Sequence, residues 1–116
     1  MPEYLPKFKP GTAVTFTASA DVIGGRAAEI TGDRTVAHAA AGSAKYVGVL
    51  GHSAKSGQKV TVHLPGQVQH GVASGAIAAG VAIQTAANGM VAAGSTPKIG
   101  LSISAAADGG DVQYID

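Results

Sequence analysis

Histidine is the side chain in this sequence best suited to bind a metal ion or to transfer a proton. The four histidines, His38, His52, His63 and His70, are separated by 14, 11 and 7 residues. Metal sites often use closely spaced ligand pairs, and no carboxylate lies within two residues of any of these histidines. The spacing therefore predicts no metal site and no cofactor. A ring built from one histidine of each subunit in a symmetric oligomer stays an alternative.

Nucleophilic and acid–base chemistry have equally little support. The segment GHSAK (51–55) matches a nucleophile elbow only in part, because it lacks the second glycine and the strand–turn–helix context of that motif. Asp108 and Asp111 lie close together, but they flank a Gly-Gly turn. Turn formation explains both carboxylates better than general acid–base catalysis. We expect no catalytic residues and no enzymatic activity.

Length and composition limit the possible partners. The 116 residues suit one domain, and the formal net charge of +1 provides no basic surface for nucleic acid. The absence of cysteine removes disulfides and thiolate chemistry. The N-terminus shows no apolar segment of the kind that forms a secretory signal. We expect neither a nucleic-acid partner nor a membrane partner.

Alternating apolar and polar residues predict short β-strands along most of the chain. In segment 59–64, Val60 and Val62 share one face, while His63 lies on the opposite, solvent-facing side. About nine or ten such strands follow one another at spacings of roughly 8–12 residues, separated by glycine-containing turns. This pattern predicts an all-β fold, a small β-barrel or sandwich. We expect residues 11–116 to form a single β domain.

Two further strand segments group their apolar side chains on one face. His70 shares a strand face with Val68 and Val72, which predicts a half-buried or interfacial histidine. Leu101 and Ile103 likewise share one face of a late strand, together with Ile99.

The segment VASGAIAAGVAIQTAANGMV (72–91) could span a membrane, form a helix or form short strands. A membrane helix needs about 20 strongly apolar residues, and this segment contains Gln84, Asn88 and several glycines. Each of those glycines would cost a helix about 1 kcal/mol. Asn88-Gly89 is a strong turn signal, because both residues tolerate positive φ. We therefore predict strands connected by turns.

The first ten residues, MPEYLPKFKP, differ from the rest in composition. Pro2, Pro6 and Pro10 recur every four residues and favour an extended chain. Three apolar side chains lie between them, those of Tyr4, Leu5 and Phe8. We consider two alternatives: a first strand packed on its own domain, or an extended arm (1–10) that docks on a neighbouring subunit or partner. In the second case Tyr4, Leu5, Pro6, Phe8 and Pro10 are the candidate partner-binding residues.

Six short motifs, taken in order, carry a resemblance to a known family. They are VTFTA, VIGGR, SAKYVGV, AKSGQKVTV, VASGAIAAG and AAADGGDV. Each is low in complexity, but their shared order and spacing, from about residue 11 to residue 115, resemble the capsid decoration (cement) proteins of tailed bacteriophages. The N-terminal MPEYLPKFKP departs from the general pattern of that family.

The resemblance implies a virion structural protein, made in the host bacterial cytoplasm, that binds the outer surface of an icosahedral capsid and stabilises the expanded shell. It implies the major capsid protein as partner and a homo-oligomer, a trimer at threefold or quasi-threefold junctions. A component of the phage tail or of a head-fibre base is an alternative, because the same small β domain could serve that different assembly role. A small β binding module that carries a lipoyl or biotinyl group is less favoured, because no lysine lies between Lys59 and Lys98.

Overall fold

The structure is a computed structural model that describes residues 13–95 and 97–116, and its regular structure there consists of ten strands and one short 3-10 helix. The elements are β1 (Ala13–Ala18), β2 (Ala27–Gly32), β3 (Thr35–His38), β4 (Tyr46–Leu50), β5 (Lys59–His63), β6 (Val68–Val72), β7 (Ala82–Thr85), η1 (Ala87–Gly89), β8 (Val91–Ala93), β9 (Gly100–Ser102) and β10 (Asp111–Ile115). The predicted all-β fold and the predicted number of strands are confirmed.

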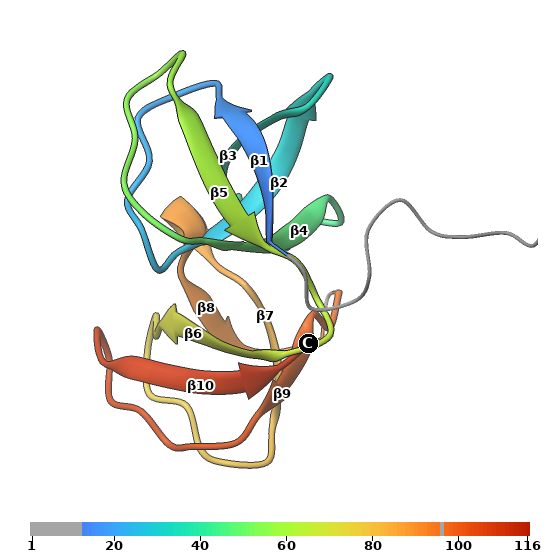
Figure 1. Ribbon diagram of the computed structural model, residues 1–116. Coiled ribbons are helices and arrows are strands. Elements are labelled where there is room, and N and C mark those ends of the chain that lie inside the picture. The colour runs from blue at the N-terminus through green and yellow to red at the C-terminus, as the bar shows by residue number, and fades with distance from the viewer. Residues whose placement is uncertain (1–12, 96) are drawn as a thin grey trace, which may run out of the picture.

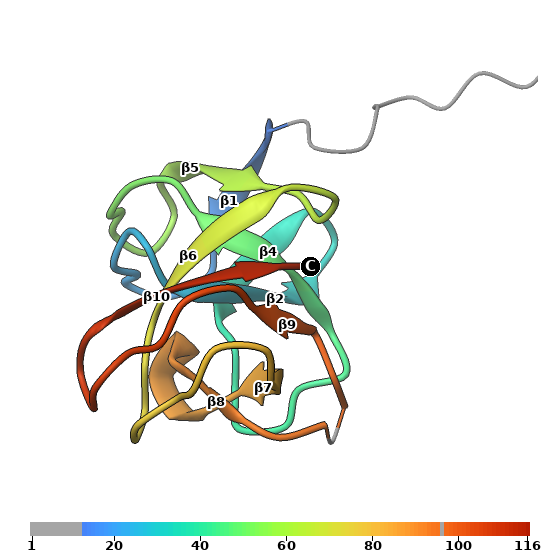
Figure 2. The ribbon, with the colours of Figure 1, turned by 90° about the horizontal axis from the view of Figure 1, so that it is seen from below.

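The strands form two sheets that stack on each other (Figure 1). The first five strands close into a barrel in the order β1-β3-β2-β4-β5. The last five form a sheet in the order β6-β10-β9-β7-β8, so that β10 lies between β6 and β9 (Figure 2). The chain therefore completes the barrel before it begins the sheet.

Barrel closure depends on β1, which has a different partner on each side. It pairs antiparallel with β5 from Ala13, opposite His63, to Thr17, opposite Lys59. On its other side it pairs with β3 in parallel. β2 and β3 form an antiparallel hairpin around Gly32-Asp33. The parallel pairing joins distant segments and has no local sequence signal.

Neighbouring residues on β2 and β4 contribute to two different hydrophobic cores, because successive side chains of a strand point to opposite faces. Ala28 and Leu50 belong to the core inside the barrel, which also contains Val36, Val60 and Val62. Each fully buried valine or leucine side chain contributes about 1.5–3 kcal/mol. This core confirms the predicted inward face of β5.

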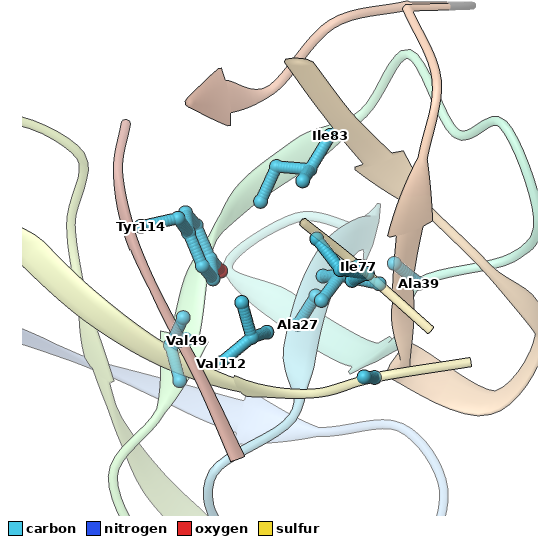
Figure 3. Close-up of a cluster of buried hydrophobic side chains, with 9 residues drawn as sticks. Ala27, Ala39, Val49, Ile77, Ile83, Val112 and Tyr114 are labelled. Atoms are coloured by element: carbon cyan, nitrogen blue, oxygen red, sulfur yellow. The ribbon is translucent and has the colours of Figure 1, made fainter. Parts of the chain in front are cut away.

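The second core lies between the barrel and the sheet. Ala27 and Val49 project from the barrel toward Ile83, Val112 and Tyr114 of the sheet (Figure 3). Tyr114 and Ile83 are fully buried. β2 and β4 thus have one face in the core of the barrel and the other face in the core between barrel and sheet. This shared use of the two strands fixes the barrel against the sheet.

The glycine- and alanine-rich segment folds as short strands and turns, as predicted. It includes β7, and Asn88 and Gly89 adopt the expected positive φ values of 58° and 73° in the turn before β8. In the part of the chain that the structure describes, no helix is long and apolar enough to span a membrane.

Candidate partner-binding surface

Exposed aliphatic side chains gather on the outer face of the sheet. Among the described residues, five large apolar side chains are exposed, and four of them belong to β6, β9, β10 or the residue after β9. We define the apolar patch as these four residues: Val68, Leu101, Ile103 and Ile115, with exposed fractions of 53%, 40%, 43% and 48%. A contiguous patch of exposed apolar side chains is a candidate site for binding a partner.

The strand register makes the patch continuous. Ile115 of β10 pairs with Val68 of β6 on one side and with Leu101 of β9 on the other. Cross-strand neighbours lie about 5 Å apart, so these three side chains form a row across the sheet. Ile103 lies next to the row, because its N–H donates to the carbonyl oxygen of Gln113 at 2.8 Å.

The inner face of the sheet explains why these residues point outward. Tyr114 fills that face, and the flanking strands place Gly71 and Gly100 beside its ring. A Cβ atom at either glycine would lie 3.0–3.1 Å from a ring carbon of Tyr114, which is too close for ordinary packing. A large side chain on β10 thus requires small residues on its neighbours. The aliphatic residues of β6 and β9 take the opposite, solvent-facing positions.

Two predictions about these strands have different outcomes. Leu101 and Ile103 share a face, as expected, and both are exposed. Ile99, predicted on the same face, instead packs against the core between the barrel and the sheet. His70 is exposed instead of half-buried, because the face it shares with Val68 is the outer one. Its Nδ1 lies 3.0 Å from Asp111 Oδ2, and both side chains are more than half exposed. Asp111 was expected only to flank a turn, and it also contacts His70. These two polar side chains lie beside the patch.

A hydrogen-bonded cluster holds the end of β10 against the barrel. The Tyr46 hydroxyl donates to Asp116 Oδ2 at 2.9 Å and lies 3.0 Å from the Tyr114 hydroxyl. The other carboxylate oxygen of Asp116 accepts the Gly66 N–H at 3.2 Å, and the Gln69 amide donates to Oδ2 at 3.2 Å. Burial raises the pKa of Tyr46 and of Tyr114, so both phenols keep their protons at neutral pH. This cluster fixes the strand that carries Ile115.

The fifth exposed aliphatic residue, Ile23, borders a hollow of about 420 Å³ on the barrel. The hollow is also lined by His38, whose Nε2 accepts the Ile23 N–H at 2.8 Å. Burial, followed by the positive charge of Arg26, lowers the pKa of His38 below its ordinary value. Ile23 is the only large exposed aliphatic residue among the described residues that line this hollow, whereas the patch combines four such residues.

Two of the four histidines, His63 and His70, line the same hollow in the described part of the chain. His63 and His70 are exposed, and His52 Nε2 accepts the Thr61 N–H at 3.2 Å. Within residues 13–95 and 97–116, no group of three or more histidine, cysteine or acidic side chains could hold a metal ion. The prediction that His63 lies on the solvent side of its strand is confirmed.

The residues predicted to bind a partner, Tyr4, Leu5, Pro6, Phe8 and Pro10, lie outside the described residues. Conversely, sequence reasoning missed the apolar patch. The only available signal was the alternation of Leu101 and Ile103 with small polar residues. That alternation does not indicate which face is buried.

The closed barrel and the five-stranded sheet packed on it define a small all-β protein. The chain belongs to the phage cement protein family, whose sequence profile matches residues 8–115. It is therefore a structural component of a bacteriophage virion.

Comparison of folds agrees with this assignment. The structure is similar to the N-terminal base of the head fibre protein gp8.5 of bacteriophage phi29, with a TM-score of 0.74 and 22% sequence identity. The match covers 90% of this chain and 92% of the other. No curated protein sequence matches the chain.

Proposed function

We propose that this protein binds the outer surface of an icosahedral phage capsid and stabilises the expanded shell without enzymatic activity. The observation that carries the proposal is the match to the phage cement protein family over residues 8–115. Its partner is the major capsid protein. Residues 11–116 act as one β domain, and residues 1–10 act as an arm.

The proposed oligomer is a trimer at threefold and quasi-threefold junctions of the shell. A cyclic trimer on a threefold site makes the same contacts three times. Because these contacts are linked, the second and third form at high effective concentration, and release from the shell becomes rare. The exposed apolar patch supports self-association, since it is apolar surface that a partner can bury.

Quantitative mass spectrometry of purified virions tests the capsid role. A molar ratio to the major capsid protein that equals a simple fraction set by threefold sites supports decoration of the whole shell. Absence of the protein from purified particles would overturn the proposal.

The arm is tested by deleting residues 1–10 and measuring binding to purified expanded shells. We expect weaker binding, because Tyr4, Leu5 and Phe8 would act as apolar anchors. Unchanged binding to the shells would show that residues 1–10 do not contribute to shell binding, either directly or through a neighbouring subunit.

A head-fibre base is the second candidate function. The fold similarity to the phi29 head-fibre base favours it, although at 22% identity the likeness concerns the fold. The same mass spectrometry separates the two, because a base present in a handful of copies would give a much smaller ratio to the major capsid protein than decoration of all threefold sites.

A further inference from the structure

We propose that the apolar patch is the docking site for the N-terminal segment, residues 1–10, of a neighbouring copy of this chain. Tyr4, Leu5 and Phe8 supply the apolar contacts. This inference rests on the proposed self-association and adds the surface that receives the arm.

The size of the patch fits a peptide better than a folded domain. Four half-exposed aliphatic side chains offer on the order of 300 Å², whereas a stable interface between two folded proteins buries about 800 Å² on each partner. A short segment with three large apolar side chains matches that smaller area, because one buried aromatic side chain alone covers about 150–250 Å². The patch therefore suits an extended arm with few anchors.

The described chain begins at the right place for such an arm. Ala13, the first residue of β1, pairs with His63 at the end of β5, where the barrel meets the sheet (Figure 1). The Gln69 amide, one residue from Val68, donates to the His63 carbonyl oxygen at 2.9 Å. The described part of the chain therefore begins next to the end of the sheet that carries the patch, and twelve residues precede it in the sequence.

Length and stiffness point to a neighbouring copy. Twelve residues in a proline-rich extended conformation reach about 37 Å, at 3.1 Å per residue. The row from Val68 to Leu101 spans two strand spacings, or about 10 Å. Such a segment is longer than its own patch requires, and the extended conformation that its prolines favour suits a span to a neighbouring copy.

Charge also matches between the two surfaces. Lys7 and Lys9 flank Phe8 in the arm. Asp111 begins β10, the strand that carries Ile115, and its side chain is more than half exposed. Basic residues beside an apolar anchor thus meet an acidic residue beside an apolar patch, which favours one orientation of the arm.

Disulfide cross-linking tests the inference directly, because the protein contains no cysteine. One preparation carries Leu5→Cys and the other carries Ile115→Cys. The two full-length proteins are mixed in the absence of shells, oxidised, and analysed by non-reducing electrophoresis and mass spectrometry. The matched control replaces Ile115→Cys with Ile23→Cys, since Ile23 is 51% exposed and lies on the barrel. Leu101→Cys is a second reporter in the patch.

We expect the mixed disulfide with Ile115→Cys or Leu101→Cys to form about tenfold faster than with Ile23→Cys, because docking raises the local thiol concentration. Equal rates for patch and control would overturn the inference. So would a double variant, Leu5→Cys with Ile115→Cys, whose disulfide forms entirely within single chains.

The outcome is separable from that of the proposed function. Cross-linking between copies that fail to bind purified shells supports the arm contact and refutes the capsid role. Shell binding without preferential cross-linking leaves the capsid role intact and refutes the arm contact.

Discussion

The cluster of Tyr46, Tyr114 and Asp116 provides a sharp test of how the barrel is held against the sheet. A phenol has one proton to donate, and a carboxylate only accepts. Since the Tyr46 hydroxyl donates to Asp116, the contact of 3.0 Å between the phenols requires Tyr114 to donate to Tyr46. The two tyrosines therefore have unequal roles, and they also differ in burial, because Tyr114 is fully buried whereas Tyr46 is partly buried.

Tyr46→Phe removes the acceptor of Tyr114 and a donor to Asp116. A buried hydroxyl without a partner costs about 1–3 kcal/mol, and a hydrogen bond to a charged group contributes about 1.5–3 kcal/mol. Asp116 keeps its contacts with Gly66 and Gln69, so we expect a loss of about 2–4 kcal/mol. Tyr114→Phe leaves the bond from Tyr46 to Asp116 in place and should cost about 1 kcal/mol.

The double variant supplies the control. With both hydroxyls removed, no phenol is left buried without a partner. Its loss should therefore be about 1–2 kcal/mol smaller than the sum of the two single losses. Urea unfolding followed by far-ultraviolet circular dichroism measures all three changes. Equal single losses, or a double loss equal to their sum, would refute the assignment of donors and acceptors.

Two further predictions concern the backbone and pH. Gly48 has φ of +144°, and a Cβ atom there would overlap the His63 carbonyl oxygen, so Gly48→Ala should cost more than about 3 kcal/mol in urea unfolding. Gly57→Ala, at φ of +88° with nothing nearby, should cost about 1 kcal/mol, and similar losses at both glycines would contradict the overlap. The pKa of His38 is lower in the folded protein than in the unfolded chain, so His38 of the unfolded chain binds its proton first as the pH falls. The free energy of unfolding should therefore keep its full contribution from neutral His38 above about pH 6.5 and decline below that pH. Unfolding measured between pH 7 and pH 5 should show a weaker decline for His38→Gln than for the unmodified chain, and an unchanged decline would rule out His38 as its source.

Local sequence was sufficient to predict most individual elements. The alternation of Val60 and Val62 with polar neighbours predicted β5 and its inward face, because a strand places successive residues on opposite sides. Asn88-Gly89 predicted a turn, because both residues tolerate the backbone angles that turns need. The order of short motifs along the chain was sufficient to indicate the family, which the match over residues 8–115 confirms.

The tertiary structure decided which faces are buried and which distant residues meet. Alternation places Leu101 and Ile103 on one face, and the ring of Tyr114, which occupies the inner side of the sheet, leaves that face in solvent. Tyr46 and Tyr114 are 68 positions apart, and their contact exists only because the sheet packs on the barrel. Alternation is a property of one strand, whereas burial depends on what packs against it. The strands and turns thus follow from local sequence, and the exposed patch follows from the packing of the two sheets.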